Sequence, residues 1–304
     1  MDALSPWGTT GISTLLSRRL FCATTLTIAA FGPVAQPVKA AGTDTIYYNS
    51  SGNKEKTLGF EVLKLALEKS GKSYALKPSP AGYSSNAGMV DAIANGAQID
   101  IAWVNASKAV SSKLLSVPFP VDMGLGGYRL FLIDSRRQAE FSTVRNLQGL
   151  KNFIALQGTG WADVDVLRKS DLTVRTGPQK NLYRMTIGKR GDYFARGVNE
   201  ALNEQAKQVA ELPDLSVETS LVLQYPSASI FYVSKARPEL RDDLMRGLEA
   251  AWKDGSFQKT FLSNPDIKLA LDKGNLKSRT IIKIPNPNLP EDILAMDERY
   301  WFKP

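Results

Sequence analysis

The residues of this sequence best suited to chemistry form a short glycine turn with polar and aromatic side chains around it. Gly158-Thr159-Gly160 follows an apolar run and precedes a helical pattern. Backbone N–H groups in such a turn point at one spot, the dipole of the following helix favours negative charge there, and the threonine hydroxyl adds a donor. The turn is therefore a candidate site for a carboxylate or a phosphate, although many turns of this kind only join two elements.

Further candidate binding residues are large or polar side chains elsewhere in the chain. Trp161 follows the turn at once and is either the floor of a pocket or a core residue. Arg129 and Arg196 could each pair with an anion through two hydrogen bonds. Tyr225 stands just before a proline, near an expected hinge. The remaining candidates are Ser50, Ser51 and Asn53 in the first strand-to-helix loop, and Trp103 and Asn105 at the end of the third strand.

A basic segment runs from Arg175 to Arg196 and carries six basic residues against one acid, Asp192. We interpret it as a solvated basic loop, with an anion-attracting lip of the binding site as the alternative. Four polar residues beside the candidates are interpreted as polar faces of helices: Asp163, Asp165, Asn199 and Glu200.

Composition excludes several kinds of catalytic site. The 304 residues include no histidine and one cysteine, Cys22. A Ser-His-Asp triad, a Cys-His dyad and a histidine-based metal site are therefore excluded, and we expect no cofactor. A carboxylate pair acting on glycans remains an alternative. The net charge of +8 is scattered and no long basic run is present, so we expect no nucleic-acid partner.

Residues 1–41 are predicted to be a secretory signal that is removed near Ala41. Arg18 and Arg19 precede a mild apolar stretch at 20–32, and small residues follow it. This stretch is shorter than the roughly 20 residues that span a bilayer, so we expect no stable membrane insertion after cleavage. The arginine pair resembles a twin-arginine export signal, and an ordinary Sec signal is the alternative.

The elements that must position the candidates alternate between strands and helices. Strand, helix, strand, helix and strand follow one another over 45–104, which is typical of a parallel sheet with crossover helices. The pattern restarts after a charged stretch at 134–140. We predict an α/β fold with lobe 1 at 42–134, lobe 2 at 135–235, and C-terminal helices and a tail at 236–304 that pack back across the lobes. Because such sheets bind ligands beyond the carboxyl ends of their strands, we expect the site in a cleft between the lobes.

Several stretches together carry a family resemblance. They are 91–103, Ser-Val-Pro-Phe at 116–119, Leu-Gln-Gly-Thr at 156–159, and 238–257. In their order and spacing, from about residue 45 to 264, the chain resembles the extracellular solute-binding proteins of family 3, typified by polar amino-acid importers. Residues 191–200 resemble an uncharacterised, atypical branch of that family.

The resemblance implies a two-lobed, type II periplasmic binding fold in which each lobe is a mixed or parallel sheet flanked by helices. It also implies a monomeric, non-enzymatic periplasmic protein that captures a small solute, which we expect to be anionic, for the membrane permease of an ABC-type importer. A periplasmic sensor subunit that reports to a membrane receptor is the alternative. Family members usually carry an arginine shortly before Ser-x-Pro-aromatic and an acid in lobe 2. Here Ala109 takes the first place and 224–229 has no acid, so the resemblance does not name the ligand.

Overall fold

The described part of the protein contains two β-sheets flanked by helices. The computed structural model describes residues 43–51 and 54–304, and the predicted signal, Cys22 and Asn53 lie outside these residues. One sheet has the strand order β2-β1-β3-β11-β4, and the other has the order β12-β10-β5-β8-β6-β7 with β9 paired to β5. The predicted α/β class, with two sheets and flanking helices, is confirmed. None of the helices among the described residues is long and apolar enough to cross a membrane.

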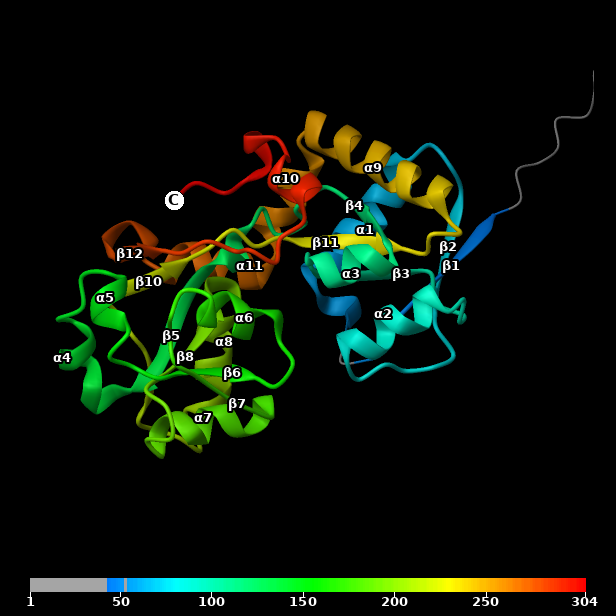
Figure 1. Ribbon diagram of the computed structural model, residues 1–304. Helices are drawn as coiled ribbons and strands as arrows, with labels where there is room; N and C mark the ends of the chain where they lie inside the picture. The colour runs from blue at the N-terminus through cyan, green and yellow to red at the C-terminus, as the bar shows by residue number, and fades with distance from the viewer. Residues whose placement is uncertain (1–42, 52–53) are drawn as a thin grey trace, which may run out of the picture. The chain divides into compact units, whose positions relative to one another are not determined.

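The first sheet combines strands from distant parts of the chain. Its strands are β1 (Asp44–Tyr48), β2 (Tyr74–Pro78), β3 (Ile101–Asn105), β4 (Leu115–Val117) and β11 (Ser229–Val233). β1 runs parallel to β2 and β3, whereas β11 runs antiparallel to β3 and β4. In Figure 1 the late strand β11, in yellow, lies among the early blue and cyan elements. The helices of this region are α1 (Leu58–Lys69), α2 (Asn86–Ala94) and α3 (Lys108–Lys113).

Helix α9 (Pro238–Lys253) packs closely on α1, as its spacing of apolar residues requires. The contact depends on Gly247, because a Cβ atom there would overlap the backbone of Ala66. Helices α10 (Ser256–Ser263) and α11 (Pro265–Lys273) follow. Phe257 and Phe261 of α10 are buried in the same core cluster as α1 and α9.

Asp243 on α9 joins this helix to β2 and its neighbours. Its buried carboxylate lies 2.7 Å from Lys72 Nζ and 2.7 Å from Arg246 Nη2, and it accepts a hydrogen bond from the Tyr74 hydroxyl. Burial alone would raise the pKa of Asp243, but these hydrogen bonds hold it below the ordinary value. The ionised carboxylate therefore stabilises the fold above the pKa of the unfolded chain, about 4, and this contribution is lost as the pH falls through the folded pKa.

Replacing Asp243 with asparagine should lower the free energy of unfolding at pH 7 by about 1–3 kcal/mol, because hydrogen bonds to a buried charge are lost. In urea titrations the deficit should stay constant from pH 8 to 5 and shrink below about pH 4. Asp242→Asn, at an exposed position of the same helix, is the control and should change little. A deficit independent of pH down to 3 would contradict the assigned charge.

The second sheet carries the middle of the chain. Its strands are β5 (Tyr128–Asp134), β6 (Ala155–Gly158), β7 (Val174–Gly177), β8 (Tyr193–Gly197), β9 (Leu215–Val217), β10 (Leu221–Gln224) and β12 (Thr280–Lys283). β6, β7 and β8 are parallel, and β5 runs antiparallel to β8, β9 and β10. Its helices are α4 (Gln138–Phe141), α5 (Leu147–Leu150), α6 (Ala162–Arg168), α7 (Gln179–Ile187) and α8 (Val198–Gln208).

Two expectations need correction here. The segment 175–196 is not a basic loop, because it contains α7 and most of β8, whose five residues are all buried. The charged residues of this segment interrupt its short apolar runs, so the helix and the strand gave no clear periodic pattern. The predicted lobe boundaries also place two strands in the wrong lobe. β5 falls within predicted lobe 1 but belongs to the second sheet, and β11 falls within predicted lobe 2 but belongs to the first sheet. Strand partners are chosen by long-range pairing, which local sequence patterns do not contain.

The chain passes between the strands of the two sheets three times, at 118–127, 225–228 and 234–279, and the last passage contains α9, α10 and α11. The first two passages, which we call the connecting segments, are bonded to each other. The Tyr225 N–H donates to the Gly127 carbonyl over 3.2 Å, and the Val121 N–H donates to the Ser229 carbonyl over 2.8 Å. The buried Asp122 carboxylate accepts backbone N–H groups from both sides, at Gly124, Gly126 and Ser229.

The C-terminal residues cover the first connecting segment. The Phe302 N–H donates to the Met123 carbonyl over 2.7 Å, and the Trp301 ring covers Gly124 so closely that a Cβ atom there would overlap it. The Tyr300 ring packs 4.7 Å from Phe119, measured between ring centroids. The tail therefore fixes this passage from outside the sheets.

Candidate functional site

The glycine turn lies at the carboxyl end of β6, between β6 and α6. Gly158 is the last residue of β6, and Gly160 has a φ of 78°, which glycine adopts without strain. The Thr159 N–H donates to the Gly177 carbonyl over 3.1 Å, which ties the turn to the end of β7. Thr159 and Gly160 are exposed, so their polar groups are open to a solute.

Trp161 connects the turn to Arg196 on β8. Its indole ring covers Gly158, and a Cβ atom on that glycine would overlap the ring. The Arg196 guanidinium carbon lies 4.8 Å from the centroid of the same ring, within the range of a cation–π interaction. Trp161 is half-buried, so it serves both as core and as a wall beside the turn.

Arg196 is buried and is held by two glutamates of α8. Its Nε and Nη2 donate to the two carboxylate oxygens of Glu204 over 2.8 and 2.7 Å, and Nη2 lies 3.0 Å from Glu200. Burial opposes the charged form, but the nearby carboxylates outweigh it and raise the pKa of Arg196. This guanidinium is therefore always charged and already has a bidentate partner.

Arg129 at the start of β5 is likewise buried and paired. Its Nη2 lies 2.8 Å from Asp163 Oδ1, and its guanidinium carbon lies 4.9 Å from the centroid of the Tyr225 ring. The Tyr225 hydroxyl donates to the same Asp163 oxygen. Burial raises the pKa of Tyr225 well above its ordinary value, so its hydroxyl keeps the proton that it donates.

The two arginines lie on opposite faces of the second sheet. Arg129 pairs in register with Gly197, and Arg196 pairs with Leu130. Because side chains alternate along a strand, Arg129 shares a face with Tyr225, and Arg196 shares the other face with Phe194 and Trp161. The structure therefore builds two separate ion-pair clusters around the turn.

The loop after β1 holds the first sheet's candidates. Ser50 is exposed, and the Ser51 N–H donates to Asn49 Oδ1 over 3.1 Å. Asn49 is buried, and its Nδ2 donates to the Tyr83 carbonyl over 2.9 Å, which joins the loops after β1 and β2. Sequence analysis overlooked Asn49, although its position directly after β1 was a usable signal.

Trp103 and Asn105 on β3 have different surroundings. The half-buried Trp103 ring packs over Gly59 of α1, with Phe60 and Phe231 at centroid distances of 6.4 and 6.5 Å. Asn105 ends the strand in register with Ser229 and is exposed. Of these two, Asn105 has its polar group available at the carboxyl end of β3.

The comparisons with known proteins agree with this arrangement of sheets. No family model matches the sequence, and no curated protein matches it at a significant level. An ancestral arginine-binding protein bound to arginine is 13% identical, with a TM-score of 0.51 over 73% of this chain and 97% of its own. The fold is that of a two-lobed periplasmic binding protein. The predicted fold is thereby confirmed.

Two further solved structures share this two-lobed fold. An ancestral arginine-binding protein bound to glutamine is 15% identical, with a TM-score of 0.51 over 74% of this chain and 98% of its own. An ancestral amino-acid-binding protein that is a precursor of cyclohexadienyl dehydratase is 14% identical, with a TM-score of 0.50 over 73% and 95%. The binding chemistry of this two-lobed protein must therefore be argued from its own residues.

Most residues of the basic segment do not lie at the turn. Lys189 and Arg190 precede β8, at the opposite edge of the sheet from the turn, and Arg175 Nη1 donates to the Arg190 carbonyl over 2.9 Å. Arg184 pairs with the exposed Glu211 over 2.6 Å. Besides Arg196, only Lys180 of this segment, in the first turn of α7, is near the carboxyl edge. Within 43–51 and 54–304 no group of acidic side chains is arranged to hold a metal ion.

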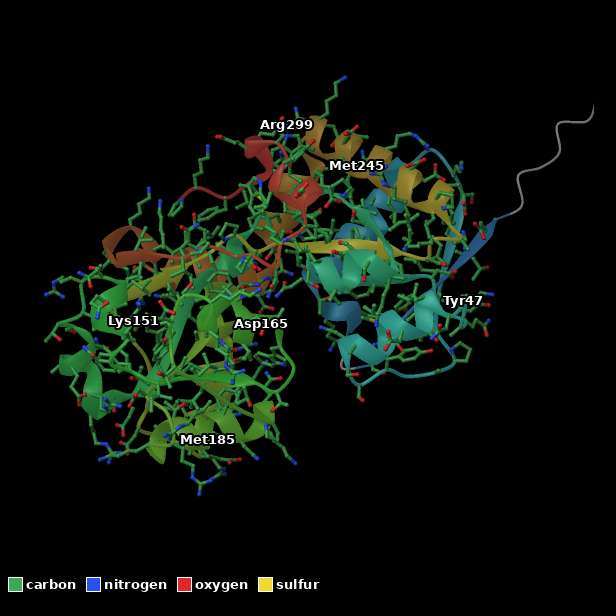
Figure 2. The ribbon with its side chains drawn as sticks, viewed as in Figure 1. Tyr47, Lys151, Asp165, Met185, Met245 and Arg299 are labelled. Atoms are coloured by element: carbon green, nitrogen blue, oxygen red, sulfur yellow. The ribbon has the colours of Figure 1, made fainter. Side chains whose placement is uncertain are left out.

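Asp163, Glu200 and Glu204 are the residues whose role sequence analysis missed. Asp163 and Glu200 were interpreted as polar faces of helices, but each holds a buried arginine. Asp165, labelled on α6 in Figure 2, is exposed, as that interpretation expected. The spacing of Arg196, Glu200 and Glu204, four residues apart, was a usable signal for a local ion pair.

Proposed function

We propose that this protein is a periplasmic binding protein that captures a small anionic solute between its two lobes for an ABC-type importer. The single observation that carries the proposal is the Gly158–Gly160 turn, whose Thr159 and Gly160 are exposed, at the carboxyl edge of a sheet in a two-lobed binding fold. Ligands of open α/β sheets bind at this edge. The protein acts as a monomer, is not an enzyme, and gives its solute to a membrane permease.

The anion of the solute would bind the turn and not the arginines directly. Arg129 and Arg196 are each occupied by carboxylates of the protein, so a clamp made of either would first have to break a buried ion pair. The Thr159 N–H already donates to the Gly177 carbonyl, so the exposed Thr159 hydroxyl and the Gly160 N–H are the donors of the turn that need no such rearrangement. We assign the arginines the task of holding the walls around the turn: Trp161 by Arg196, and α6 by Arg129.

The first sheet would supply the opposite wall of the site. Ser50, Ser51 and Asn105 follow the parallel strands β1 and β3 at their carboxyl ends, and Asn49 fixes the loop that carries the serines. These neutral donors and acceptors suit the uncharged part of a solute. Trp103 would support this wall from within the lobe.

A thermal-shift screen tests the capture of a solute. The chain without residues 1–41 is screened against dicarboxylates, amino acids, phosphates and sugars. A ligand that binds only the folded state at about 100 times its Kd should add about 2.7 kcal/mol of stability. We expect the hits to carry a carboxylate or a phosphate. Hits confined to neutral sugars would refute the anionic class, and turnover of any hit by the pure protein would refute a pure binding role.

Replacing Thr159 with valine should weaken binding of an anionic hit about tenfold, because one hydroxyl donor to a charged group is lost while the volume is kept. Isothermal titration calorimetry on both proteins measures the change. Thr173→Val, at the end of the loop before β7, is a control that should bind normally. If Thr159→Val and the parent bind the solute with equal affinity, the turn is not part of the binding site.

Import and sensing require different partners. A permease and an ATPase encoded beside the gene favour import, whereas a kinase or cyclase favours a sensor subunit that passes the bound state to a receptor. Both roles use the same capture step, so the binding experiments hold for either.

A further inference from the structure

One oxygen of Asp163 receives a donor from the second connecting segment and another from the strand that follows the first. Arg129 lies two residues after the first segment, and Tyr225 begins the second. The Arg129 guanidinium and the Tyr225 hydroxyl both contact Asp163 Oδ1, while no hydrogen bond of the described residues involves Oδ2. The arginine also lies over the tyrosine ring. These three residues, which we call the hinge triad, form a closed set of contacts.

The backbones that carry the hinge triad are themselves bonded. The Tyr225 N–H donates to the Gly127 carbonyl over 3.2 Å, and a Cβ atom on Gly127 would overlap the Tyr225 carbonyl. The two segments therefore run in close contact just where the triad begins. Arg129 on β5 pairs in register with Leu223 on β10, so Arg129 and Tyr225 stand where the two segments join the second sheet.

Asp163 in turn belongs to the structure that carries the glycine turn. It lies in the first turn of α6, three residues after Gly160, and the Val164 N–H donates to the Trp161 carbonyl over 3.1 Å. The Trp161 N–H donates to the Gly158 carbonyl over 3.1 Å. Asp163 is therefore tied to the turn through the two residues that separate it from Gly160, and the hydrogen bonds on either side of Trp161 hold this stretch in place.

We propose that the hinge triad couples the glycine turn to the connecting segments, with Arg129 and Tyr225 acting as positioning residues through Asp163. A movement of the turn displaces Asp163, and Asp163 passes this displacement to Arg129 and Tyr225 through its two contacts. This inference rests on the proposed function, since it assigns the turn to the solute. It adds the contacts through which solute binding at the turn would alter the connecting segments.

The contacts of Arg129 in the hinge triad differ from the apolar packing of a core. A buried arginine uses strong, directional bonds, and here Arg129 Nε has no partner among the described residues although it is buried. The guanidinium is instead held by its ion pair with Asp163 and its contact with the Tyr225 ring. Packing would be satisfied equally by an apolar side chain of similar size, without a link between three separate segments.

Hydrogen–deuterium exchange on the full chain without any solute tests the coupling. Tyr225→Phe removes only the hydroxyl, and Asp163→Asn keeps the shape but removes the charge. We expect both variants to speed exchange about tenfold at the amides of Gly124, Gly126 and Gly127, as well as in α6. Tyr193→Phe is the matched control, because the buried Tyr193 hydroxyl on the same sheet has no partner among the described residues.

A second control separates coupling from general loss of stability. Asp243→Asn is expected to destabilise the protein through α9, with no contact to the triad, and should leave the three hinge amides unchanged. Faster exchange confined to α6, or equal acceleration in Asp243→Asn, would overturn the proposal. Because no solute is present, this result is independent of the thermal-shift screen. If the exchange results show coupling but the thermal-shift screen finds no ligand, only the assignment of the turn to a solute is refuted. If the screen finds ligands but the exchange results show no coupling, only the role of the hinge triad is refuted.

Discussion

Replacing Arg129 with methionine should lower the free energy of unfolding by about 3–5 kcal/mol, because it leaves the Asp163 carboxylate in a largely buried place without its cation. The side chain of Arg129 is 3% exposed and that of Asp163 is 13% exposed, so water cannot fully replace the lost partner. Guanidinium chloride titration of both proteins measures the difference. Methionine keeps most of the apolar volume, so the effect reports the charge and not a cavity.

Two further variants decide whether the ion pair is the cause. Arg184→Met breaks a pair in which both side chains are more than 60% exposed, and it should change stability by less than about 1 kcal/mol. Arg129→Met combined with Asp163→Leu removes both charges and should recover part of the loss. If Arg129→Met lies within 1 kcal/mol of the parent, the pair does not hold α6 to β5.

Replacing Gly158 with alanine should weaken the binding of an anionic solute about 100-fold, or about 2.7 kcal/mol. The added methyl group would overlap the Trp161 ring, so the ring must leave its place over the strand. Moving it disturbs both the contact with Arg196 and the turn that follows Gly158. Overpacking of this kind also costs about 1–3 kcal/mol of stability.

Calorimetric titration with a hit from the solute screen measures this loss of affinity. Gly149→Ala in α5 is the matched control, because a methyl group there meets only ordinary contacts with Val144 and Asn146. It should bind with parental affinity. Parental affinity in Gly158→Ala, together with a displaced Trp161 in its fluorescence spectrum, would show that the solute binds elsewhere.

Local patterns in the sequence were sufficient to find many elements. Over 238–253 the apolar residues repeat at helical spacing and Pro238 suits a first turn, which predicts a helix, and α9 has these bounds. The second strand of the alternation predicted over 45–104 is β2, and the helix predicted after the glycine turn is α6. The strand β8 was missed, since its arginine and the charged residues before it interrupt the apolar pattern.

The sequence by itself determined the turn at 158–160, the alternation of strands and helices, and the exclusion of histidine and thiol chemistry. Only the tertiary structure decided which sheet β5 and β11 join, and which carboxylate holds each arginine. The reason is physical: helix and turn formation depend on neighbours within a few residues, whereas Asp163 meets Tyr225 across 62 positions of the chain. Such a contact exists only after the strands have paired, so no local pattern could have revealed it.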